Sequence, residues 1–262
     1  MSESAVHKVF DAHVHVGYFP RLDGKGGDVY YYSPARLLQY MRWAGVDEFV
    51  FSSTNACWDA HAEAMHPEAM EVLRLAALQG LKAHPFFWVS RDYLKWDGSL
   101  DRLPAFYEGI KLHGAEARWT KRSKAFRRIL AIARERGLPV QIHTGNDDLD
   151  GCAGYLPYCR EFPAVRMDLA HGHYVQDAVR ALRECPNVWV DVSFMELDEV
   201  KAVWAVAPGR VMYGSDFPAP LRYWNTSCTE YMRRRMRQMR SIGGDGIMSA
   251  NARAFLQGSE AK

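Results

Sequence analysis

Eight short β-rich runs alternate with helical patterns along the chain, and this alternation limits the fold more than any other feature. The runs lie at residues 9–16, 48–53, 83–89, 107–113, 140–144, 166–171, 188–193 and 211–215. Strands that alternate with helices form parallel sheets, because each parallel connection must cross back over the sheet. Eight such units close a barrel, so we expect an α/β fold, a (β/α)8 TIM barrel, with residues 1–262 forming one domain.

Capping residues mark the helices between these runs. Ser33 followed by Pro34 predicts a helix start and Gly45 predicts its end, while Pro67 and Gly80 bracket the next helix. Further helices are expected at residues 100–106, 124–136, 155–162, 175–185, 197–206, 229–242 and 249–256. A doubly wound open sheet is the rival fold, but it would need a glycine-rich phosphate loop after the first strand, where this chain has histidines.

The composition excludes several classes of protein. With 33 basic and 31 acidic residues, the net charge gives no reason to expect a nucleic acid or an anionic membrane as partner. The basic run at 233–240 has methionines at helical spacing, which indicates the solvated face of an amphipathic helix. Five cysteines without a C-x-x-C pair favour a reducing compartment and disfavour a thiolate zinc site. We expect a cytoplasmic protein with a small-molecule substrate, and its aromatic loops leave room for a homodimer.

Histidines and acidic residues fall at the strand ends. His13 and His15 point to one side of the first strand, because side chains alternate along a strand, and two such imidazoles can hold one metal ion. Taken alone, the pair could equally be core or surface histidines. Other polar residues end later strands, namely Lys111, His113, His143, His171, Asp191 and Asp216. Burying them would cost several kcal/mol unless a cation or a complete hydrogen-bond network satisfied them.

Seven ordered motifs resemble the amidohydrolase superfamily. They read D-A-H-V-H-V-G, G-I-K-L-H, V-Q-I-H-T-G, L-A-H-G-H, V-W-V-D-V-S, Y-G-S-D-F-P and N-A-R-A-F-L, between residues 8 and 256. The chain looks most like the amidohydrolase-2 branch, which includes metal-dependent hydrolases and the aminocarboxymuconate-semialdehyde decarboxylase group.

The resemblance assigns roles to five of the strand-end residues. His13, His15, His143 and Asp216 match the residues that hold one divalent ion, usually zinc, in mononuclear members. Asp216 would also serve as general base. His171 matches the histidine that orients or deprotonates the attacking water.

Other positions keep two interpretations. Lys111 falls where binuclear members carry a carboxylated lysine that bridges two metal ions, although many members keep a plain lysine that contacts the substrate. We favour one ion. His113, Arg118, Trp58 and Arg222 are expected to contact the substrate, because arginine suits carboxylate recognition and aromatic rings suit a flat or apolar body.

A site of three histidines and one carboxylate with an open position is the catalytic arrangement, and it lowers the pKa of bound water to about 7. The sequence therefore predicts a metal-dependent hydrolase that cleaves a C–N or C–O bond, an amide or a lactone, in a small carboxylated substrate. The alternative is a metal-dependent non-oxidative decarboxylase of a small unsaturated or aromatic acid. A barrel that binds metal without catalysis is a third, weaker hypothesis.

Overall fold

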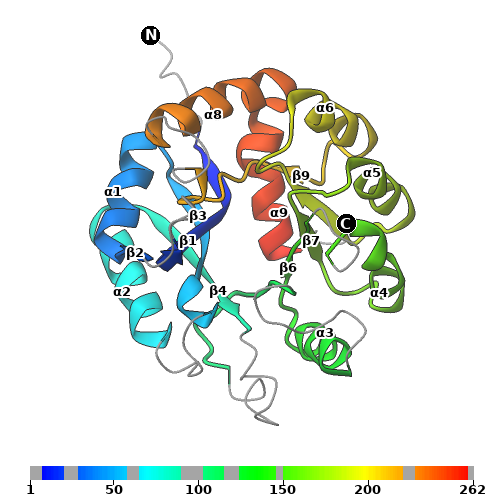
Figure 1. Cartoon of the computed structure of the whole chain (residues 1–262), viewed down its shortest axis with the longest axis horizontal. Helices are drawn as coiled ribbons and strands as arrows, with labels where there is room; N and C mark the ends of the chain where they lie inside the picture. The colour runs from blue at the N-terminus through cyan, green and yellow to red at the C-terminus, as the bar shows by residue number, and fades with distance from the viewer. Residues whose placement is uncertain are drawn as a thin grey trace.

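The computed structural model describes residues 8–20, 29–57, 65–89, 103–114, 124–145, 150–220 and 228–258. Within these ranges the sheet curls round and the helices surround it (Figure 1). Its parallel strands are β1 (Phe10–Pro20), β3 (Glu48–Ser53), β4 (Lys82–Trp88), β5 (Gly109–Leu112), β6 (Val140–His143), β7 (Met167–Ala170), β8 (Val188–Asp191) and β9 (Val211–Met212), hydrogen bonded in that order. All eight expected runs overlap one of these strands, and six of them contain the whole strand.

The barrel closes where β1 meets the segment that follows β9. The amide of Ala12 donates to the carbonyl of Tyr213 at 2.9 Å, and the amide of Asp216 donates to the carbonyl of His13 at 2.8 Å. The amide of His15 donates to the carbonyl of Phe217 at 2.6 Å. We call residues 12–15 and 213–217 the β1–β9 seam. The expected (β/α)8 TIM-barrel fold is confirmed.

The helices begin and end close to the predicted caps. The Ser33 hydroxyl accepts the Arg36 amide at 3.3 Å at the start of α1 (Pro34–Ala44), and Gly45 ends it with φ 84°, which glycine adopts without steric cost. α3 (Lys124–Arg136) and α6 (Leu197–Val206) keep the predicted bounds. In the described ranges the other α-helices are α2 (Met65–Leu78), α4 (Leu156–Glu161), α5 (Val175–Glu184), α8 (Cys228–Asp245) and α9 (Asn251–Gln257).

Two expectations differ from the structure. Residues 29–32 form a short strand, β2 (Val29–Tyr32), which pairs antiparallel with the end of β1, so that Tyr18 faces Tyr31. The helix expected at 100–106 is wrong for the part that the structure describes, because residues 105–106 form a turn in which the Tyr107 amide donates to the Pro104 carbonyl at 3.2 Å. Residues 100–102 lie outside the described ranges.

The C-terminal helix covers the end of the barrel where the strands begin. In Figure 1, α9 lies at the centre of the ring of helices. Phe255 of α9 packs against Phe86 and Trp189, with ring centroids 6.3 and 5.8 Å apart. Arg253 donates to one oxygen of Glu48 at 2.8 Å. The C-terminal helix therefore closes this end of the barrel with apolar packing.

A cluster of charged side chains ties this closed end together. The other oxygen of Glu48 lies 3.0 Å from Nε2 of His84, and Nδ1 of His84 lies 2.7 Å from Glu108. Burial alone would lower the pKa of His84, but its hydrogen bonds to the two glutamates outweigh burial and raise the pKa to about 9. His84 is therefore a protonated link between two carboxylates at neutral pH.

The basic run lies on the solvated face of α8, as predicted. Met232, Met236 and Met239 are buried against the barrel, while the exposed positions are Arg233, Arg234, Arg237 and Arg240. None of the described helices combines the length and the apolar run that a bilayer crossing requires.

Candidate metal centre

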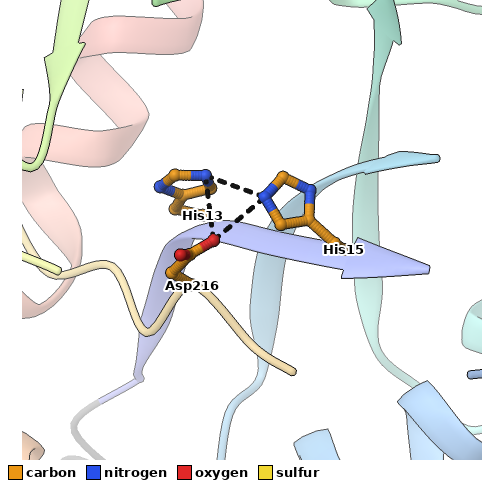
Figure 2. Close-up of side chains that lie close together, drawn as sticks. All are labelled: His13, His15 and Asp216. Atoms are coloured by element: carbon orange, nitrogen blue, oxygen red, sulfur yellow. Dashed lines mark hydrogen bonds and ion pairs between the residues drawn. The ribbon is translucent and has the colours of Figure 1, made fainter. Parts of the chain in front are cut away.

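Two histidines and an aspartate converge across the seam. Nε2 of His13 and Nε2 of His15 lie 3.0 Å apart, and Oδ1 of Asp216 lies 3.3 Å from the first and 3.0 Å from the second (Figure 2). His13 and His15 project from β1, and Asp216 follows β9. Ligands bound at 2.0–2.2 Å to one tetrahedral ion lie about 3.3 Å from one another. The three atoms therefore have the spacing that one ion requires.

Hydrogen bonds fix which ring nitrogens face the group. Nδ1 of His13 lies 3.1 Å from Oδ2 of Asp191, and Nδ1 of His15 lies 2.9 Å from the Ser52 hydroxyl. If each Nδ1 carries the proton, each Nε2 presents a lone pair to the other and to the carboxylate. Acceptors that face one another at about 3 Å need a cation between them, so the donor set fits a divalent metal ion.

Burial keeps both rings neutral. Removal from water lowers the pKa of His13 to about 4, with the nearby Lys111 charge adding to the effect, and lowers the pKa of His15 well below its usual range for the same two reasons. A neutral imidazole is the form that binds metal, so neither ring has to lose a proton at pH 7.

Lys111 lies fully buried beside the group. Its Nζ is 2.7 Å from Nε2 of His13 and 3.2 Å from Oε1 of Gln141. Gln141 in turn donates to Asp168 at 2.9 Å, which places a carboxyl group two contacts from the ammonium. The Lys111 ammonium thus lies next to the histidine–aspartate group, and its role there stays a prediction.

His143 enters a different group from the one expected. Its ligand atom clusters with those of His113 and Asp150, and its ring stacks on that of His113 with centroids 3.7 Å apart and planes 10° apart. Stacked parallel rings direct their lone pairs side by side rather than toward one point, so this cluster is poorly arranged to hold an ion of its own. The role of His143 as the third histidine ligand stays a prediction.

A chain of hydrogen bonds orients His143 through His171. The Ser193 hydroxyl donates to Asp191 and so accepts from Nδ1 of His171, at 2.7 Å. Nε2 of His171 is then free to accept from Nδ1 of His143, 3.2 Å away, which leaves Nε2 of His143 with its lone pair. His171 also lies beside the metal group, with its ring centroid 5.1 Å from that of His13.

Left-handed backbone conformations occur at two of these positions. His171 has φ 69° and Asp216 has φ 52°, values that residues other than glycine rarely adopt. Such strain costs of the order of 1–3 kcal/mol per residue and concentrates at functional sites. The left-handed backbone at His171 and Asp216 therefore supports a functional role for these two strand ends.

Sequence reasoning did not assign roles to Asp191, Ser193 and Ser52. The Asp191 carboxylate accepts from Nδ1 of His13, the Ser52 hydroxyl contacts Nδ1 of His15, and the Ser193 hydroxyl accepts from Nδ1 of His171. The V-W-V-D-V-S run could have pointed to Asp191 and Ser193, because a polar pair that ends a buried strand needs partners inside the barrel. Nothing in the sequence marked Ser52.

Aromatic rings surround the mouth of the group. The ring of Trp88 lies 5.1 Å from that of His15 and stacks at 5.7 Å on that of His113, while Phe19 lies 6.0 Å from His15. His113 therefore contributes to this wall, although its contact with a substrate stays a prediction. The other expected substrate contacts, at Trp58, Arg118 and Arg222, lie outside the described residues.

The fold and the site together indicate the class of the protein. It is a TIM barrel with a candidate metal site, formed by buried histidines and an aspartate at the strand ends. A family profile described as amidohydrolase (amidohydrolase 2) matches residues 10–256, and the chain belongs to this family. Comparison with curated proteins gives no match.

Solved structures with the same fold include both hydrolases and decarboxylases. An amidohydrolase 2 from Bifidobacterium longum subsp. infantis is 20% identical, with a TM-score of 0.63 and coverage of 95% of this chain and 98% of that one. A probable 2-pyrone-4,6-dicarboxylic acid hydrolase from Acinetobacter baumannii is 12% identical, with a TM-score of 0.64 and the same coverage. A 5-carboxyvanillate decarboxylase from Sphingomonas paucimobilis is 11% identical, with a TM-score of 0.66 and again 95% and 98% coverage. At these identities the likeness establishes the fold.

Proposed function

We propose that this protein is a metal-dependent hydrolase that cleaves the C–N or C–O bond of an amide or lactone in a small carboxylated substrate. The observation that carries the proposal is the convergence of His13, His15 and Asp216 to within 3.0–3.3 Å of one another. The nitrogen and carboxylate donors suit zinc, and we propose a single ion. When bound, the ion would activate a water molecule and polarise a carbonyl oxygen.

We propose that Asp216 moves a proton during the reaction. Both of its contacts with the histidines involve Oδ1, and within the described residues Oδ2 has no hydrogen-bond partner. The side chain is 11% exposed, so Oδ2 can meet the water or the substrate at the mouth. We propose that this oxygen takes the proton of the attacking water and returns it to the leaving nitrogen or oxygen.

We propose that His171 orients the water. Ser193 fixes its Nδ1, so the ring keeps one orientation, which is what positioning requires. Its Nε2, 3.2 Å from Nδ1 of His143, would contact the water in place of that ring. Lys111, 2.7 Å from Nε2 of His13, would turn its ammonium toward a substrate oxygen when the ion occupies the group.

One observation favours the alternative reaction. The aromatic wall formed by Phe19, Trp88 and His113 suits a flat unsaturated body beside the metal group. A non-oxidative decarboxylase of a small unsaturated or aromatic acid would use the same residues, with protonation of the substrate carbon replacing attack by water. Assay of a substrate panel for carbon dioxide against released acid or amine separates the two reactions.

The test of the metal site uses a matched pair of variants. Asp216→Asn keeps the shape of the side chain but removes the charge and the basic oxygen, so turnover should fall at least about a thousandfold. Asp198→Asn, at a highly exposed aspartate that pairs with Lys201, should keep wild-type activity. Metal content is measured by plasma mass spectrometry on both. Full activity of metal-loaded Asp216→Asn would refute the role assigned to Asp216.

A further inference from the structure

A pocket lies behind the strand end that carries Ser193. Residues 194–196 lie between β8 and α6, and together with Leu197 at the start of α6 and one face of α8 they line an open pocket of about 310 Å³. This is the lower end of the volume range in which proteins bind small molecules. The pocket is separate from the metal group, none of whose ligand candidates line it. We call it the α6–α8 pocket.

The walls of the pocket differ in character. Phe194, Met195 and Leu197 give an apolar wall on the β8–α6 side, and Arg234 and Gln238 give a polar wall on α8. A small molecule that has an apolar body and a polar head can therefore satisfy both walls at once.

The charge on the polar wall is positive. Arg234 and Arg235 line it, and within the described ranges neither forms an ion pair with a carboxylate. Arg235 donates to the carbonyls of Val192 and Met195 at 3.1 and 2.9 Å, both through Nη2. The guanidinium of Arg235 has five N–H groups, so those on its other nitrogens can still donate to a ligand. Two arginines outweigh the single acidic lining residue, Glu196, so the pocket favours an anion.

Phe194 connects the pocket with the candidate active site. Its ring lines the pocket and also lies 5.6 Å from the ring of His171, with the planes 61° apart. The preceding residue, Ser193, holds Nδ1 of His171 at 2.7 Å. Phe194 has φ 63°, so its backbone is held in a conformation that surrounding contacts must stabilise. A molecule bound in the pocket would contact the Phe194 ring directly.

We propose that the α6–α8 pocket binds a small organic acid with an apolar body and that the occupant shifts Phe194 against His171, which makes the pocket a regulatory site. The carboxylate would lie at Arg234 and Gln238, and the apolar body would lie on Phe194, Met195 and Leu197. This proposal goes beyond the proposed hydrolase activity and does not depend on it, because binding in the pocket needs neither metal nor turnover.

The test follows binding of 4-fluorobenzoate to the purified full-length protein by nuclear magnetic resonance. The backbone amides of residues 194–197 should shift along one saturation curve, and the ring nitrogens of His171 should shift along the same curve. The neutral 4-fluorobenzamide, which has the same shape, should bind at least about fivefold more weakly, because it lacks the charge that pairs with arginine. Site-resolved shifts separate the pocket from any binding at the metal group.

Three variants test the arginine. Arg234→Gln, at an exposed position that can be changed without loss of the fold, should weaken 4-fluorobenzoate binding at least about fivefold. Gln238→Glu, which adds a negative charge to the same wall, should also weaken it. Arg237→Gln removes an exposed arginine from the same helix, outside the pocket lining, and should leave the affinity unchanged. Equal binding of acid and amide, or wild-type affinity in Arg234→Gln, would overturn the proposed site. An unshifted His171 ring at saturation would overturn the proposed coupling.

Discussion

Removal of the His84 imidazole should take away a pH-dependent part of the stability of the barrel. His84 links Glu48 and Glu108 at the closed end, and its side chain is 16% exposed. Its pKa rises from the ordinary value of 6.5 to about 9 on folding. At about 1.4 kcal/mol per unit of pKa, this shift corresponds to roughly 3 kcal/mol of folding free energy. The link is thus worth a large fraction of a typical domain stability.

The sign follows from the direction of the shift. A group whose pKa is higher in the folded protein stabilises it fully below the unfolded pKa, here 6.5. That contribution declines as the pH rises and is lost once the pH passes the folded pKa of about 9. The wild type should therefore lose roughly 3 kcal/mol more than His84→Gln between pH 6 and pH 10.

Urea unfolding followed by tryptophan fluorescence, in the presence of a chelator, measures this difference at each pH. His173→Gln is the matched control, because burial lowers the pKa of His173 and its contribution to stability has the opposite dependence on pH. If the free energies of unfolding of wild type and His84→Gln run parallel from pH 6 to pH 10, the assignment of His84 as a charged link is wrong.

Three further predictions concern packing, positioning and metal. Gly109→Ala places a methyl group into the buried ring of Phe86 on the neighbouring strand, so urea unfolding should show a loss of about 1–3 kcal/mol. Ser193→Ala frees Nδ1 of His171 and should lower kcat roughly tenfold with KM little changed, whereas a purely structural role would leave steady-state kinetics of the folded variant unaltered. Zinc at a hundred times its dissociation constant should raise the free energy of unfolding by about 2.7 kcal/mol over the chelated protein, and an unchanged unfolding midpoint would contradict the proposed site.

Local signals in the sequence predicted much of the architecture. The Ser33 cap and the terminating Gly45 act within one helical turn, so the bounds of α1 follow from neighbouring residues. The antiparallel strand β2 was missed because its pairing joins Tyr31 to Tyr18, thirteen positions earlier in the chain. The run of tyrosines is compatible with a loop or a strand, and only its tertiary partner decides between them.

For the candidate site, the sequence predicted which side of a strand each residue faces but not how its side chain is oriented. Alternation placed His13 and His15 on one side of β1, and the barrel architecture placed Asp216 at the same end. Alternation does not say how a ring turns about its side-chain bonds. The stacking of His143 on His113, and the contact of the Ser52 hydroxyl with Nδ1 of His15, depend on contacts between strands distant in sequence. The local sequence around one strand contains no signal for such contacts.

The β1–β9 seam gives a bound ion a mechanical consequence. The seam joins parts of the chain about two hundred residues apart, as in the 204-residue separation between the Ser215 amide and the Asp11 carboxylate that accepts it, and β9 itself has only two residues. An ion held by His13 and His15 on one side and Asp216 on the other would link β1 to the segment after β9 and so stabilise the seam that closes the barrel. Hydrogen exchange of the Ala12 and Asp216 amides should then slow on metal loading more than exchange elsewhere in the sheet. Binding of the ion would therefore stabilise the closed barrel in the same step that completes the proposed active site.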